Sequence, residues 1–122
     1  MINVLIVEDV DEMRELLAHA LKDIPELNVT GTARNTIEGR WELTRRRPDL
    51  VLLDEILPGE SSLNWLEELR AQGLDVILIT SLAGRTEPLP EGALGRIVKP
   101  GWKTLVQDRK RIRSEILAAL RA

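Results

Sequence analysis

Residues 3–17 read NVLIVEDVDEMRELL, and this stretch decides the fold class. Residues 4–7 are all apolar, which is the pattern of a strand that is covered on both faces. From residue 10 to residue 21, apolar side chains recur at three-to-four spacing, the pattern of an amphipathic helix. A doubly covered strand followed by a helix predicts an α/β fold with a parallel sheet.

The same alternation continues along the chain. Short strands are predicted at 28–33, 50–53, 76–79 and 97–98, and further helices at about 36–46, 62–71 and 103–120. In the helix at 62–71, Leu63, Leu66 and Leu69 are expected to face the core. Right-handed crossovers leave few strand orders for such units. We predict a doubly wound, flavodoxin-like sheet of five parallel strands in the order 2-1-3-4-5.

Residues 82–95, LAGRTEPLPEGALG, interrupt this alternation. A fourth helix is expected here, between the fourth and fifth strands. Pro88 and Pro90 oppose it, because proline lacks the backbone N–H that a helix interior needs. The fourth helix is therefore predicted to be shortened or irregular, as a loop or a single turn.

The composition limits the classes of protein that fit. A chain of 122 residues with 43% apolar residues suits one domain over residues 1–122. The net charge of -3 argues against direct binding of nucleic acid, and the absence of cysteine excludes disulfides and thiol chemistry. No apolar stretch approaches a membrane span, and no signal-peptide pattern is present. We therefore expect a soluble, cytoplasmic protein that does not contact membranes.

Carboxylates follow two of the predicted strands. Glu8 and Asp9 come directly after the first strand, and Asp54 comes directly after the third. In this strand order, the carboxyl ends of both strands meet at the crevice where ligands bind. Like charges this close call for a counter-charge, and Mg²⁺ is a suitable one because it prefers oxygen ligands. In the alternative reading, Asp9 and Glu12 cap a helix and Asp54 merely ends a strand.

A hydroxyl and an ammonium are expected at the same rim. Thr80 ends the fourth strand and Lys99 follows the fifth. A carboxylate can accept a phosphoryl group, while a cation and a hydroxyl stabilise its oxygens. Each residue alone is more readily an ordinary surface residue, so the combination carries the argument for phosphoryl transfer.

Four segments resemble the successive motifs of response-regulator receiver domains, the CheY-like domains of two-component signalling systems. The segments are NVLIVEDVDEMRELL, PDLVLLDEILPGESSLNWLEELR, DVILITS and GRIVKP, and together they cover essentially the whole chain. The resemblance implies that Asp54 is the phosphoacceptor, with a sensor histidine kinase or a phosphotransfer protein as the donor. It also implies that one Mg²⁺ is held by Asp9, Asp54, Glu8 and the backbone carbonyl of Ile56.

The resemblance implies further roles and partners. Thr80 would be the switch hydroxyl, and Lys99 would pair with the phosphoryl group, aimed inward by a cis peptide bond before Pro100. Such a domain is not a turnover enzyme, since its own chemistry is limited to phosphorylation and dephosphorylation of itself. Dephosphorylation should be slow, because Ile56 and Leu82 flank the path of the attacking water and are apolar. An output domain or downstream protein would be a partner, and the chain would be a monomer or weak dimer.

Two positions depart from the family pattern. Arg96 stands where many receivers carry an aromatic switch residue, and the chain has no Phe or Tyr. Trp102 is expected to pack in the core. These departures support an alternative, a pseudo-receiver that acts as a protein-interaction domain without phosphorylation. An unrelated phosphatase or small flavodoxin-like binding protein is disfavoured, because Glu55 should point away from Asp54 and no glycine-rich loop follows the first strand.

Overall fold

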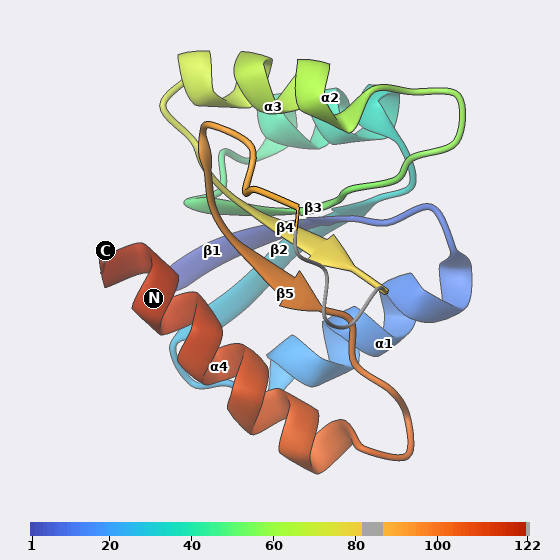
Figure 1. Ribbon diagram of the computed structural model, residues 1–122, viewed down its shortest axis with the longest axis vertical. Helices are drawn as coiled ribbons and strands as arrows, with labels where there is room; N and C mark the ends of the chain where they lie inside the picture. The colour runs from blue at the N-terminus through green and yellow to red at the C-terminus, as the bar shows by residue number, and fades with distance from the viewer. Residues whose placement is uncertain (82–86, 122) are drawn as a thin grey trace.

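A computed structural model describes residues 1–81 and 87–121 of the chain. Within these residues the chain forms five strands and four helices (Figure 1). In chain order these are β1 (Ile2–Val7), α1 (Asp11–Lys22), β2 (Leu27–Ala33), α2 (Thr36–Arg45), β3 (Leu50–Asp54), α3 (Ser62–Ala71), β4 (Asp75–Thr80), β5 (Ala93–Val98) and α4 (Leu105–Arg121).

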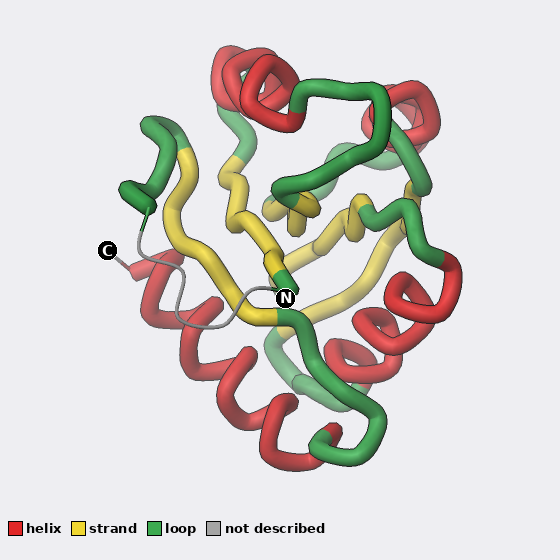
Figure 2. Tube along the Cα trace, turned by 45° about the vertical axis from the view of Figure 1, so that its right-hand side comes forward, coloured by secondary structure: helices red, strands yellow, loops and turns green. Residues whose placement is uncertain are grey.

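The strands form one parallel sheet in the order β2-β1-β3-β4-β5. The predicted α/β class and the predicted strand order are therefore confirmed. Helices α1 and α4 cover one face of the sheet, and α2 and α3 cover the other (Figures 1 and 2). The three central strands supply buried side chains to both faces, which explains why β1, β3 and β4 read as continuous apolar runs.

The hydrophobic core lies in two layers on either side of the sheet. Leu50 and Leu52 of β3 pack toward α1 and α4, whereas Val51 and Leu53 pack toward α2 and α3. All five residues of β3 are buried. The rigid centre of the sheet therefore ends at Asp54, whose placement is fixed by packing on both sides.

Two expectations about packing were wrong. Leu63 is 55% exposed, because α3 turns Ser62, Trp65, Leu66 and Leu69 inward and that stripe excludes Leu63. Trp102 is 54% exposed and lies edge-on to His19, with 5.5 Å between the ring centroids. Leu63 shows that a period read from sequence can assign the wrong member of a neighbouring pair to the core.

The segment between β4 and β5 lacks a helix in its described part, residues 87–92. Ala93 N donates to the carbonyl of Pro90, which closes a turn before β5 begins. β5 starts at Ala93, earlier than the predicted start at residue 97. The prediction of a shortened or irregular fourth helix is borne out there, and residues 82–86 lie outside the described residues.

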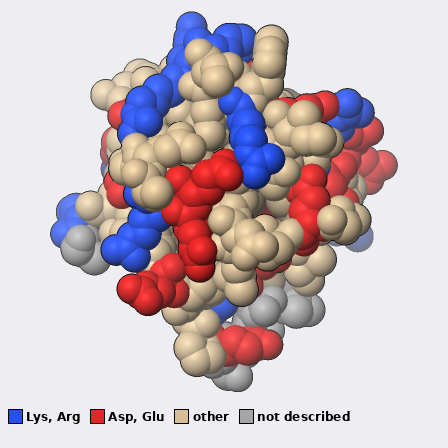
Figure 3. All heavy atoms as spheres, turned by 90° about the horizontal axis from the view of Figure 1, so that it is seen from above, with Lys and Arg blue, Asp and Glu red and all other residues tan. Residues whose placement is uncertain are grey.

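Charged side chains of both signs lie next to one another on the face formed by α2 and α3 (Figure 3). The ion pairs Arg40–Glu68 and Arg45–Glu42 belong to this face, with N–O distances of 2.9 and 2.7 Å.

Among the described helices, none is both long and apolar enough to span a bilayer.

Candidate functional site

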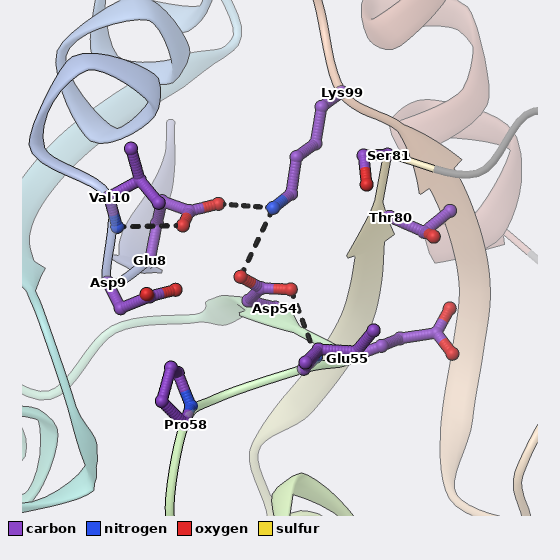
Figure 4. Close-up of a pocket in the computed structure, with 10 residues that line it drawn as sticks. Glu8, Asp9, Val10, Asp54, Glu55, Pro58, Thr80, Ser81 and Lys99 are labelled. Atoms are coloured by element: carbon purple, nitrogen blue, oxygen red, sulfur yellow. Dashed lines mark hydrogen bonds and ion pairs between the residues drawn. The ribbon is translucent and has the colours of Figure 1, made fainter.

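The candidate site is a hollow of about 240 Å³ at the carboxyl ends of β1, β3, β4 and β5 (Figure 4). It lies where the strand order reverses between β1 and β3, the usual ligand position in such sheets. Its lining contains Ser81 together with the acidic residues, the hydroxyl and the cation singled out from the sequence, which are Glu8, Asp9, Asp54, Thr80 and Lys99.

Three carboxylates meet at this hollow. Glu8, Asp9 and Asp54 each offer an oxygen within 4.8 Å of the other two. Glu8 and Asp54 are buried, whereas Asp9 is half-buried. The alternative reading of Asp9 as a helix cap does not hold, because the N-cap of α1 is Val10 and no side chain bonds there.

The buried carboxylate of Glu8 is held from two directions. Its Oε2 accepts a hydrogen bond of 3.0 Å from the backbone N–H of Val10. Its Oε1 lies 2.6 Å from the ammonium of Lys99, as an ion pair without hydrogen-bond geometry. A carboxylate with no solvent contact needs such a partner, since an isolated buried charge is very costly.

Lys99 links Glu8 to Asp54. Its Nζ donates to Asp54 Oδ2 at 3.1 Å, and its backbone N–H donates to the carbonyl of Thr80 at 2.8 Å. Burial of the ammonium acts to lower the pKa of Lys99, but the contact with Glu8 and the charge of Asp54 outweigh it and raise the pKa. Lys99 therefore carries a positive charge against both carboxylates.

The expected cis peptide bond before Pro100 was wrong, because the described residues contain no cis peptide bond. Trans is the lower-energy form even before proline. The hydrogen bond from Lys99 N to Thr80 O continues the pairing of β5 with β4. That pairing brings the lysine to the site without the rarer isomer.

Asp54 is fixed by its own loop and by α3. Its Oδ1 accepts from the backbone N–H of Ile56 at 3.0 Å, and its backbone carbonyl accepts from Ser62 Oγ at 2.8 Å. Ser62 is buried at the start of α3 and was not singled out from the sequence. A serine at a helix start usually reads as a cap, so only the tertiary contact distinguishes it.

Thr80 and Ser81 line the hollow at the end of β4, and Glu55 points away from Asp54 (Figure 4). Glu55 instead pairs with Arg96 of β5. The expected direction of Glu55 agrees with this placement, whereas its partner was missed. The sequence indicated only that Arg96 replaces an aromatic residue, and no local pattern connects positions 41 residues apart.

The donor set suits a hard divalent cation. Carboxylate oxygens converge from three residues, and the buried Glu8 Oε1 accepts no hydrogen bond. Mg²⁺ prefers a few carboxylates, a backbone carbonyl and retained waters in octahedral geometry. The residues present therefore fit Mg²⁺, with Asp9 and Asp54 as the carboxylates open to the hollow.

A family model for the response regulator receiver domain matches residues 4–112. A protein-glutamate methylesterase/protein-glutamine glutaminase from Rhodopseudomonas palustris is 32% identical over 99% of this chain and 36% of its own length. A protein with the same name from Agrobacterium fabrum is 39% identical over 67% of this chain and 24% of its own length. The chain thus spans only about a quarter to a third of these relatives.

Solved structures give the same result. The response regulator domain of Thermotoga maritima CheB aligns with a TM-score of 0.83 at 24% identity, covering 100% of this chain and 98% of that one, which shows the shared fold. The response regulator TrrA of Thermotoga maritima aligns with a TM-score of 0.70 at 27% identity, covering 93% and 99%. With the family model matched over most of its length, this chain belongs to the response-regulator receiver domains of two-component signalling systems.

Proposed function

We propose that the chain is a phosphoacceptor that receives a phosphoryl group on Asp54 from a histidine kinase or a phosphotransfer protein. The observation that carries this proposal is the position of Asp54. It is buried at the end of β3, lies against the Lys99 ammonium at 3.1 Å, and shares the hollow with Glu8 and Asp9. A buried carboxylate with a fixed cation and an acidic metal cradle suits phosphoryl transfer better than a structural role.

In the proposed reaction, Asp54 is the nucleophile. An oxygen of the Asp54 carboxylate attacks the phosphorus of a phosphohistidine, a P–O bond forms and the P–N bond breaks. The electron pair of that bond leaves with the imidazole, which takes up a proton from solvent. Lys99 is placed to neutralise a phosphoryl oxygen. Thr80 lines the same hollow, and in this proposal its hydroxyl donates to another phosphoryl oxygen.

Mg²⁺ would be held by Asp9 and Asp54, by the backbone carbonyl of Ile56, and by Glu8 directly or through water. When bound, it supplies positive charge to the phosphoryl oxygens. Because the chain itself carries the phosphoryl group after the transfer, we class it as a signalling phosphoacceptor and not as a turnover enzyme. Its self-dephosphorylation should be slow. Ile56, two residues beyond Asp54, presents an apolar side chain that is 63% exposed and cannot orient a water.

The nature of the relatives supports these partners. A chain from the crystal structure of the P1 domain of CheA3 in complex with CheY6 from R. sphaeroides aligns with a TM-score of 0.84 at 25% identity, covering 99% of this chain and 98% of that one. TrrA was solved in complex with Mg²⁺-BeF. We infer a kinase-type donor, Mg²⁺ as cofactor, and an output domain or downstream protein that responds to the phosphorylated form.

The test is intact mass after incubation with acetyl phosphate and Mg²⁺. We expect a gain of one phosphoryl group in the native chain and in Asp75→Ala, an exposed acid at the opposite end of the sheet. Asp54→Ala should gain nothing, and omission of Mg²⁺ should suppress the gain. If neither acetyl phosphate nor a phosphorylated kinase domain modifies the native chain, the phosphorylation-independent pseudo-receiver, which Arg96 favours, replaces this proposal.

A further inference from the structure

Two consecutive acidic residues at the end of β3 are each paired with a cation from the end of β5. Asp54 pairs with Lys99, and Glu55 pairs with Arg96. β3 and β5 are not neighbours in the sheet, because β4 lies between them. Both pairs therefore reach across the end of β4: Lys99 meets Asp54 in the hollow, whereas the Glu55 side chain points away from Asp54 to meet Arg96 (Figure 4).

The Glu55–Arg96 pair is more than a surface ion pair. The side chain of Glu55 is 8% exposed and that of Arg96 is 14% exposed. Arg96 Nε donates to Glu55 Oε1, and Arg96 Nη2 donates to Glu55 Oε2 at 3.4 Å. A two-point contact of this kind fixes the orientation of both groups, and breaking a largely buried pair leaves an uncompensated charge.

Arg96 also makes a third contact, with the segment between β4 and β5. Its Nη1 donates to the backbone carbonyl of Glu87 at 2.9 Å. Glu87 begins the described turn that contains Pro88, Leu89 and Pro90, and Leu89 is 40% exposed. One guanidinium thus connects the residue next to the phosphoacceptor with a surface turn. Lysine could not reproduce this, because its ammonium lacks the rigid fork of donors.

The backbone around Glu55 is equally constrained. Glu55 N donates to Ile79 O at 3.1 Å, and the following N–H, of Ile56, donates to Asp54 Oδ1 at 3.0 Å. Phosphorylation of either oxygen would change the second contact, because the phosphorylated carboxyl group no longer carries the negative charge of the Asp54 carboxylate that accepts this hydrogen bond. Any shift of the backbone at residues 54–56 moves the Glu55 carboxylate, and therefore its partner Arg96.

We propose that Arg96, acting through Glu55, positions the backbone that follows Asp54 and transmits a change there to the surface turn at residues 87–92. This inference rests on the proposed phosphorylation at Asp54. It assigns to an ion pair the coupling that an aromatic side chain provides in many receivers. The turn at residues 87–92 is then the surface whose structure depends on phosphorylation.

The experiment is ¹H–¹⁵N NMR of the full chain with Mg²⁺ and beryllium fluoride as the phosphoryl mimic. The backbone amides of Asp9, Ile56 and Lys99 report on the site, and those of Leu89, Glu91 and Gly92 report on the turn. In the native chain both sets should shift, together with the Arg96 Nε–H signal. In Arg96→Gln the site set should still shift, whereas the shifts of the turn set should fall to the level seen at Asp75, far from the site.

Further variants separate positioning from general damage. Arg96→Gln should also weaken Mg²⁺ binding by about 10-fold, the scale observed for partners that orient metal ligands, and Arg96→Lys should restore only part of this loss. The double variant Arg96→Gln/Glu55→Gln removes both charges, so it should keep the fold even where Arg96→Gln does not. Its turn amides should respond to the mimic as little as those of Arg96→Gln. Arg40→Gln breaks the exposed pair with Glu68 and should change nothing.

The outcomes distinguish the two proposals. If the site amides respond in every chain and the turn amides respond equally in the Arg96 variants, the coupling role of Arg96 is wrong while phosphorylation at Asp54 stands. The coupling role is also wrong if the turn amides of the native chain stay unmoved while the site amides shift. If the site amides do not respond to the mimic and no phosphoryl group is gained by mass, both proposals fail.

Discussion

The residues at the carboxyl ends of β3 and β5, which we call the β3 rim and the β5 rim, are held in place by different interactions. Every residue of β3 is buried, so Asp54 is placed by packing against both layers of the core. In β5 only Ile97 is buried, and its functional side chains are placed by ion pairs, Lys99 with Glu8 and Asp54 and Arg96 with Glu55. The difference teaches that packing places Asp54 within the sheet, whereas the β5 side depends on charges that phosphorylation alters.

The largest effect is expected from the lysine that joins the two rims. Lys99→Met should lower the free energy of unfolding by about 3 kcal/mol without divalent cations, because it leaves the buried carboxylate of Glu8 without its cation. Urea unfolding measures this. Arg40→Met is the control, since its pair with Glu68 is exposed on both sides and its loss should cost less than about 0.5 kcal/mol. Equal losses in the two variants would mean that water, and not Lys99, compensates Glu8.

A smaller effect on stability is expected from Mg²⁺ bound at Asp9 and Asp54. Mg²⁺ at about ten times its dissociation constant should stabilise the chain by about 1.4 kcal/mol, because it binds the folded state alone. Thermal unfolding with and without Mg²⁺ measures this. Asp9→Asn should remove the stabilisation, whereas Asp11→Asn should retain it, since Asp11 is 76% exposed and lies outside the carboxylate cluster. A Mg²⁺ effect that survives Asp9→Asn would place the ion elsewhere.

The rim of β3 was largely predictable from sequence. Short apolar runs, short connections and right-handed crossovers lead to one strand order, and the residue that follows a strand in that order has a known position. Glu8, Asp9 and Asp54 therefore could be assigned to one crevice before any side chain was placed. The same argument gave the direction of Glu55, because successive side chains at the end of a strand point to opposite sides.

The rim of β5 was not predictable in the same way. Its pairing with β4 shifts register between Val76 and Ile77, and this shift decides that Arg96 lies opposite Leu78. No periodic pattern encodes such an irregularity. The exposure of Trp102 and the trans bond before Pro100 also depend on how the chain leaves β5, which is set by tertiary contacts of the following turn.

The smallest effect concerns that turn, which carries the chain from Lys99 into α4. Asp108 accepts hydrogen bonds from Gly101 N at 2.9 Å, from Thr104 Oγ1 and from Arg111 Nη2 at 3.2 Å. The Thr104 hydroxyl acts most strongly to lower the pKa of Asp108 below its ordinary 3.8. Asp108→Asn should therefore cost about 1 kcal/mol at neutral pH.

The stability lost in Asp108→Asn should depend on pH. A carboxyl whose pKa is lower in the folded chain stabilises that chain fully above its unfolded pKa, and the contribution disappears as pH falls through the folded pKa. The difference in unfolding free energy between the native chain and Asp108→Asn should thus be constant at neutral pH, begin to fall near the unfolded pKa of about 4, and be lost as pH falls through the lower pKa of the folded chain. Asp75→Asn controls for the loss of one negative charge at an exposed position. If the loss persists undiminished in acid, the turn is held by packing, and the β5 rim would be less dependent on charge than its ion pairs indicate.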